Sequence, residues 1–91
     1  MKAHKSILLL GRDDHAEAMR VAAGLTIFGH KVRLVFMTGP VAETPENVRQ
    51  AELLELSDIE PETTVPGQDL PHVSAEALSL AMVEADAVIS L

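Results

Sequence analysis

The chain has no cysteine and very few aromatic residues. Because cysteine is absent from all 91 residues, the protein forms no disulfide, no zinc–cysteine centre and no thiolate nucleophile. Aromatic residues make up 2% of the chain and hydrophobic residues 47%. The core must therefore be built from aliphatic side chains, alanine and methionine, which bury less area per residue than large rings do.

Positive charge is missing from the second half of the chain. No lysine or arginine follows Arg49, whereas nine acidic residues lie beyond it and the net charge of the whole chain is −7. Binding to a nucleic-acid backbone requires clustered positive charge, so this composition excludes nucleic acid as a partner. We expect the acidic half to be a solvated surface, with docking of a basic protein partner as the alternative.

Long apolar runs are also absent. The apolar run at residues 7–10 is too short for the core of a signal peptide, and no run is long enough to cross a membrane. The sequence therefore predicts a cytoplasmic protein that does not contact a membrane. Residues 1–91 have the size of one domain. A mean hydropathy of +0.18 is high for so small a globule, so we expect a homo-oligomer.

Residues 6–28 have the pattern of a strand followed by a helix. Residues 6–10 are an apolar run typical of a strand that is buried on both faces. Residues 14–28 have helical spacing, in which Asp14 and Glu17 resemble a capping box and Gly29 ends the helix. The predicted apolar face of this helix consists of Ala18, Val21, Ala22, Leu25 and Phe28.

A second strand is predicted at residues 32–37, which are β-branched and aliphatic. Lys31 and Arg33 at its start indicate partial exposure, as on the edge of a sheet. A strand, a helix and a second strand within this distance form a right-handed crossover, in which the two strands are parallel. We expect the first strand to lie centrally in the sheet.

The second half of the chain predicts two more helices and a last strand. Thr44 and Pro45 mark the start of a helix that runs to about residue 56. Residues 57–73 are mainly loop, with a possible short strand at residues 63–65. Ser74 opens the third helix, whose predicted apolar positions are Leu78, Ala81, Met82 and Ala85, and residues 87–91 form the last strand.

This alternation of strands and helices predicts a three-layer α/β/α sandwich with a short parallel sheet, either flavodoxin-like or Rossmann-like. Ligands of such sheets bind in a crevice beyond the carboxyl ends of the strands. The candidate ligand-binding residues are accordingly Gly11, Arg12, Asp13, His15, Thr38 and Gly39.

The segment from Gly11 to His15 permits two interpretations. A glycine turn that leads into a helix can bind an anion through free backbone N–H groups, and Arg12 would add a charged donor. Aspartates at the same place repel an anion, however, and already serve as helix caps. Capping is the favoured interpretation, and an anion site is the alternative.

Other chemistry has little support in the sequence. Glycines do not follow Gly11 at the spacing of a dinucleotide fingerprint. The four histidines show no paired ligand spacing, and no serine has the glycine context of a nucleophile elbow. We therefore assign no catalytic residue, and we expect neither a metal nor another cofactor.

Three segments resemble the DsrE/DsrF-like family of sulfur-relay proteins. They are the aliphatic strand at residues 5–10, the helix end Ile-Phe-Gly-His-Lys-Val at residues 27–32, and the strand and loop Leu-Val-Phe-Met-Thr-Gly-Pro-Val at residues 34–41. The closing segment, residues 85–91, is similar to a late strand of the same family.

This resemblance implies a DsrE-like subunit of homo- or hetero-oligomers, often trimers or hexamers, that takes part in intracellular sulfur transfer. Catalytic members of the family carry a persulfide on a cysteine in the second half of the chain. Since this chain has no cysteine, the resemblance implies a non-catalytic subunit or adaptor, which binds a protein partner or a small ligand at the strand-end crevice.

A second resemblance concerns residues 13–18. Asp-Asp-His-Ala-Glu-Ala is similar to the Asp-x-His-x-x-Gly phrase of cobalamin-binding domains, in which the histidine ligates cobalt, although Ala18 stands where that phrase has glycine. The alternative to an adaptor is therefore a binding domain for a small anion or a cobalamin-like molecule, or an enzyme, that uses Arg12 and His15 together with Thr38.

Overall fold

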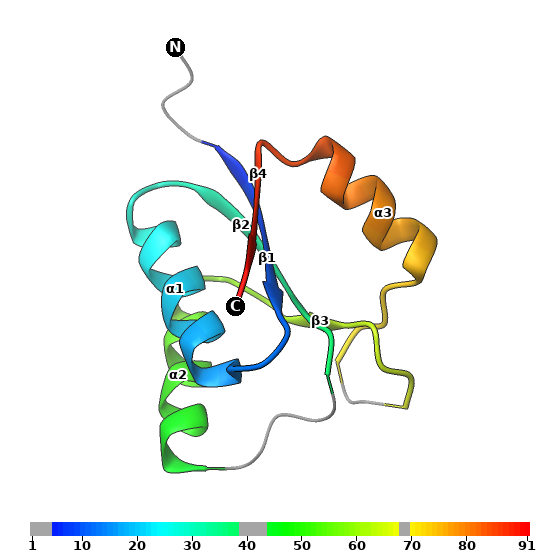
Figure 1. Cartoon of the computed structure of the whole chain (residues 1–91). Coiled ribbons are helices and arrows are strands. Elements are labelled where there is room, and N and C mark those ends of the chain that lie inside the picture. The colour runs from blue at the N-terminus through cyan, green and yellow to red at the C-terminus, as the bar shows by residue number, and fades with distance from the viewer. Residues whose placement is uncertain (1–4, 39–43, 68–69) are drawn as a thin grey trace.

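The computed structural model describes residues 5–38, 44–67 and 70–91. In this part of the chain, parallel strands alternate with helices in a doubly wound α/β topology (Figure 1). The elements are β1 (Ser6–Gly11), α1 (His15–Ile27), β2 (Lys31–Phe36), α2 (Pro45–Leu56), β3 (Glu62–Thr63), α3 (Ala75–Glu84) and β4 (Ala87–Ser90). The sheet has the order β3-β2-β1-β4, and each neighbouring pair of strands is parallel.

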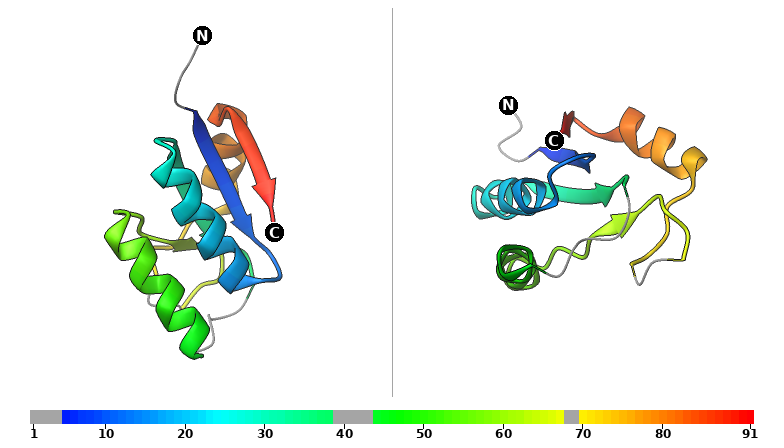
Figure 2. Two further views of the ribbon diagram at one scale, coloured as in Figure 1. Left: turned by 90° about the vertical axis from the view of Figure 1, so that its left-hand side faces the viewer. Right: turned by 60° about the horizontal axis from the view of Figure 1, so that its bottom comes forward.

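The elements form three layers, as the sequence predicts. Helices α1 and α2 lie on one face of the sheet and α3 lies on the other (Figure 2). Strand β1 is central, because β2 pairs with it on one side and β4 on the other. Its side chains alternate between the two faces. Leu9 is fully buried in the cluster under α1 and α2, whereas Leu8 and Leu10 belong to the cluster under α3.

Strand β2 differs from its prediction as an edge strand, since it lies between β1 and β3. The exposure expected of Lys31 and Arg33 is nevertheless observed. Strand β3 has two residues, which pair with Val35 and Phe36 of β2, so among the described residues no strand pairs with the first half of β2 on that side. The sequence therefore predicted the exposure correctly and its cause wrongly.

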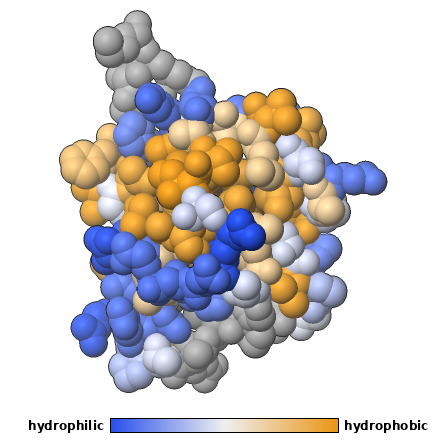
Figure 3. All heavy atoms as spheres, in the orientation of Figure 1, coloured by the Kyte–Doolittle hydropathy of each residue, from blue (hydrophilic) through white to orange (hydrophobic). Residues whose placement is uncertain are grey.

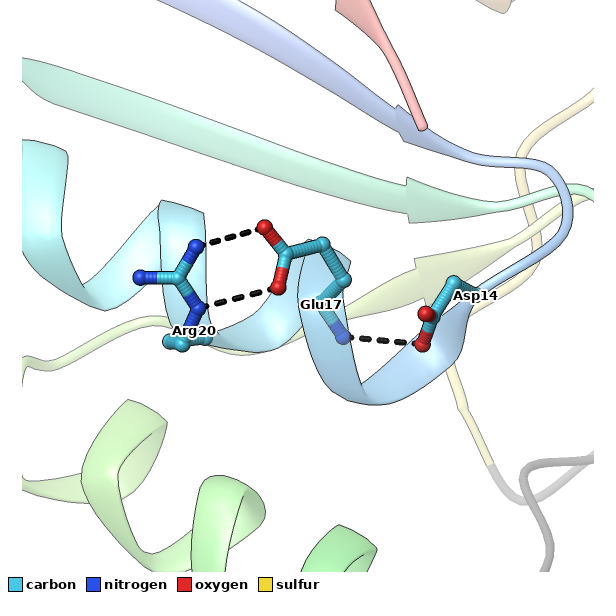
Figure 4. A network of polar contacts seen from close by, with 3 residues as sticks. All are labelled: Asp14, Glu17 and Arg20. Atoms are coloured by element: carbon cyan, nitrogen blue, oxygen red, sulfur yellow. Dashed lines mark hydrogen bonds and ion pairs between the residues drawn. The ribbon is translucent and has the colours of Figure 1, made fainter.

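Helix α1 begins and ends as the sequence predicts. The side chain of Asp14 accepts a hydrogen bond from the Glu17 backbone N–H at 3.0 Å (Figure 4). Glu17 does not complete a capping box, because its carboxylate forms an ion pair with Arg20, with a separation of 2.9 Å between Arg20 Nε and Glu17 Oε2. This pairing lowers the pKa of Glu17. Gly29 follows the helix at φ 89°, a conformation that favours glycine.

The buried face of α1 is made of small residues and one methionine. Ala18, Met19, Ala22 and Ala23 are buried, and the alanines allow the helix to approach the sheet closely. Phe28 was predicted to lie on this face, but its side chain is 79% exposed. The reason is its position as the C-cap, beyond the last turn that packs on the sheet.

Helices α2 and α3 also begin at their predicted caps. Thr44 accepts a hydrogen bond from the Asn47 backbone N–H, and Ser74 accepts one from the Ala77 backbone N–H. In α3, Leu78 is buried, and Ala81 and Ala85 pack against the same cluster. Met82, predicted to lie inward with them, is 44% exposed.

Candidate functional site

The chain changes direction at β1. Strands β2 and β3 extend the sheet on one side of β1, and β4 then returns to the other side. In an open parallel sheet, this reversal creates a crevice beyond the carboxyl ends of the two strands that flank it. A cavity of about 320 Å³ lies there, lined by Arg12, Asp13, Met37, Thr38, Ser90 and Leu91.

Three of the six predicted residues line this cavity, namely Arg12, Asp13 and Thr38. Gly11 ends β1 just before it, and Gly39 lies outside the described residues. Met37 and Ser90 also line the cavity and were not predicted from the sequence. Their position at strand ends could have identified them, because Met37 directly follows β2 and Ser90 is the last residue of β4.

The backbone of the β1–α1 turn is already hydrogen-bonded. The Leu91 carbonyl accepts hydrogen bonds from the backbone N–H groups of Arg12 and Asp13, at 2.7 and 3.0 Å. An anion in the cavity would therefore meet the Arg12 side chain beside the Asp13 carboxylate, without these two amides. This arrangement supports the interpretation of the turn as a cap and a connection between strands.

Gly11 is required by packing. A Cβ atom at this position would lie 2.7 Å from Phe36 Cδ1 and 3.3 Å from the Ala18 Cβ. The residue is buried between β2 and α1, so the absence of a side chain lets the helix and the neighbouring strand approach. Its presence in the predicted crevice thus has a structural cause.

His15 is held in place by two neighbours. Its Nε2 lies 3.1 Å from Thr38 Oγ1, and its ring meets the Phe36 ring edge to face, with 4.9 Å between centroids. The hydrogen bond occupies one of the two ring nitrogens. Among the residues that the structure describes, no cluster of histidine and acidic side chains could hold a metal ion. The geometry offers a fixed imidazole beside a hydroxyl group at the rim of the cavity.

Two of the larger cavities lie away from the strand ends. One, of about 470 Å³, lies at the amino ends of β1 and β2 and includes the ion pair between Arg33 and Glu62. Arg33 Nε and Glu62 Oε1 are 2.6 Å apart, and this hydrogen bond raises the pKa of Arg33. The other, of about 490 Å³, lies at the end of α2 and is lined in part by Leu54, Ile59 and Leu70. Neither was predicted from the sequence.

The α3–β4 unit, residues 75–90, has an unusual distribution of apolar side chains. Val83 is 83% exposed, Leu80 59%, Met82 44% and Val88 41%. Figure 3 shows a broad hydrophobic area on the side of the molecule where β4 faces the viewer in Figure 1. In the described part of the chain, no element covers these side chains.

The fold and the strand-end cavity define a doubly wound α/β domain with an all-parallel sheet. No helix among residues 5–38, 44–67 and 70–91 is long and apolar enough to cross a membrane. No family model, curated protein or solved structure matches the sequence. The resemblance to the DsrE/DsrF-like family therefore stays a prediction.

Proposed function

We propose that this chain is a non-catalytic, DsrE-like subunit or adaptor of intracellular sulfur metabolism, which functions by binding other protein subunits. The observation that carries the proposal is the exposed apolar surface of the α3–β4 unit. The trimeric or hexameric assembly of DsrE-like proteins is the expected context for such a surface. A partner bound at the strand-end crevice would lie next to this surface, because the crevice is at the carboxyl end of β4.

Helix α3 exposes most of its large apolar side chains. Its sequence, Ala-Glu-Ala-Leu-Ser-Leu-Ala-Met-Val-Glu, has charged residues only at Glu76 and Glu84, yet Leu78 is its one buried residue. A helix that is apolar on most of its circumference normally packs on more than one side. Burying one leucine or valine side chain is worth roughly 1.5–3 kcal/mol, so a partner over Leu80 and Val83 would gain substantial free energy.

The non-catalytic part of the proposal follows from the side chains at the cavity. The chain has no thiol to carry sulfur. The hydroxyl of Thr38 does contact an imidazole, but a nucleophile of this type needs a base that a third group orients, and donors for the developing charge. In the described residues, no carboxylate bonds to His15, and Leu91 already occupies the amides of Arg12 and Asp13.

Sedimentation velocity of the purified chain, alone and mixed with cysteine-bearing DsrE-type proteins of the same genome, tests the proposal. We expect a complex in at least one sample, and we expect Val83→Asp to abolish it. Leu56→Asp is the matched control, because both side chains are 83% exposed and Leu56 lies at the end of α2. A monomer in all samples, or equal loss in both variants, would contradict the proposal.

A second candidate function is the binding of a small anion or a cobalamin-like molecule. The cavity that Arg12 and Thr38 line, with His15 at its rim, favours it. Calorimetric titration with inorganic phosphate and absorbance spectra with cobalamin would measure it. Binding that is lost in Arg12→Ala and His15→Ala supports this candidate. No binding signal with the unsubstituted chain would rule it out.

A further inference from the structure

We infer that the partner at β4 is a second copy of this chain, whose β4 pairs antiparallel with the first β4 about a twofold axis through Val88. This inference rests on the proposed function and deepens it, because it names the partner and its mode of docking. The two sheets would become one continuous sheet. Val88 would face Val88 of the second copy.

The two edges of the sheet differ in protection. Edge strands of monomers are usually short, or carry charged residues and proline, because unpaired backbone groups recruit other strands. Strand β3 fits this description: it has two residues, Pro61 precedes it, and Glu62 forms an ion pair with Arg33. Its edge is also occupied by the bridge between Thr63 and His72.

Strand β4 has four residues and is therefore longer than β3, and it has neither of the other protective features. Residues 87–91, Ala-Val-Ile-Ser-Leu, include no charged residue and no proline. Val88 exposes 41% of its surface. In the left view of Figure 2, no described helix or loop lies beyond β4 on its open side. An uncharged and uncovered edge strand is a template for strand addition.

The charges at the two ends of β4 favour the antiparallel direction. Glu84 and Asp86 precede the strand, and Asp86 also accepts a hydrogen bond from the Ser6 backbone N–H. Arg12 is held at the other end through its hydrogen bond to the Leu91 carbonyl, with Asp13 beside it. Parallel pairing would set Asp86 beside Asp86. Antiparallel pairing sets this acidic end against the end that carries Arg12.

The proposed axis also brings apolar surface together. A twofold axis perpendicular to the sheet keeps both copies of α3 on the same face of the joined sheet. The Val88 side chains become directly opposite, where cross-strand pairs have their shortest separation. The exposed Leu80 and Val83 then lie on the helices that flank the new interface. A self-complementary surface of this kind needs no other protein.

Sedimentation equilibrium of the full chain between about 1 and 200 µM measures the dimer. We expect Val88→Lys to raise the dissociation constant by roughly 30-fold or more, because two like charges would lie directly opposite. Val48→Lys is the control, since Val48 is also a valine, 49% exposed, on α2. Val48→Lys should change the dissociation constant of the dimer by no more than about twofold. Far-ultraviolet circular dichroism confirms that both variants are folded.

Hydrogen exchange supplies a second measurement that needs no variant. The amides of residues 87–90 should exchange more slowly as the protein concentration rises, and those of β3 should not change. Arg12→Glu should weaken the dimer by about three- to tenfold, because it sets an acid against Asp86. In a parallel dimer Arg12 would not lie near Asp86 of the second copy, so Arg12→Glu would not weaken the dimer.

The outcomes separate this inference from the proposed function. The inference is overturned if the unsubstituted chain stays monomeric at 200 µM. It is also overturned if Val88→Lys leaves the dimer intact. If the unsubstituted chain forms no such dimer but still binds a DsrE-type protein, and Val83→Asp abolishes that binding, the proposed function holds without the inference. If it binds nothing, both are wrong.

Discussion

Two helices of this domain, α1 and α3, connect parallel strands across the sheet and differ sharply in how they pack. Helix α1 buries four of its 13 residues and contacts β1, β2 and α2. Helix α3 buries one of ten, although its sequence is the more apolar. The difference lies in the neighbours, since α1 shares its face of the sheet with α2 and α3 is the one described helix on the other face (Figure 2).

The comparison shows that apolar composition and burial are separate properties. The β1–α1–β2 unit, residues 6–36, contains 11 of the 14 buried hydrophobic residues that the structure describes, so stability should be concentrated there. The α3–β4 unit has apolar residues that this domain does not use for folding. We expect substitutions in the first unit to change the free energy of unfolding and those in the second to change association.

The largest effect should come from Leu9→Ala. Leu9 is fully buried beneath α1, so its truncation removes apolar contacts and leaves a cavity, at a cost of about 2–5 kcal/mol. Leu80→Ala in α3, where the side chain is 59% exposed, should cost less than about 1 kcal/mol. Urea denaturation at a concentration that keeps the protein monomeric measures both. Equal losses would show that the two units contribute equally to stability.

A second pair of substitutions tests packing within the first unit. Gly11→Ala should lower the free energy of unfolding by about 1–3 kcal/mol, because its Cβ would lie 2.7 Å from Phe36 Cδ1. Gly24→Ala should instead raise it by about 0.5–1 kcal/mol, since this helical glycine has no atom within 4 Å of its Cβ position. Thermal melting followed by circular dichroism gives the sign of each change. A stabilising Gly11→Ala would show that α1 is less tightly packed than we describe.

The helix caps should behave differently in the two units. Asp14→Ala and Ser74→Ala each remove a hydrogen bond from a backbone N–H to the cap side chain, which should cost about 1 kcal/mol of stability. In α1 the loss should appear in global unfolding, because the helix is part of the main core. In α3 it should appear as faster hydrogen exchange confined to residues 75–84. Identical exchange patterns in the two variants would contradict this view.

The smallest effect concerns the pH response of α1. The Arg20 guanidinium holds the pKa of Glu17 below its ordinary value of 4.5. Since the folded-state pKa is the lower one, the stability contributed by the pair is present above the unfolded pKa and is lost as the pH falls through the folded pKa. Arg20→Ala should return the Glu17 pKa toward its ordinary value. Nuclear magnetic resonance titration of the carboxyl carbon measures the shift, and an unchanged value would show that the pair does not form in solution.

The site could be predicted in part. Arg12, Asp13 and Thr38 were selected correctly as neighbours, because the carboxyl ends of parallel strands meet at one edge of the sheet. The role of Leu91 could not be predicted, since its carbonyl reaches Arg12 and Asp13 across 79 and 78 positions of the chain. The ion pair between Arg33 and Glu62 is separated by 29 positions. No local pattern reports such contacts.

Local sequence patterns are sufficient to place the helices, the longer strands and the helix starts. Asp14, Thr44 and Ser74 each accept a hydrogen bond from an amide three residues ahead, and such interactions act within one helical turn. Tertiary structure alone decided which apolar residues are covered. Phe28 and Met82 fit the apolar pattern and are nevertheless exposed, because burial depends on which elements stack on a helix, and that is decided by segments far away in the chain.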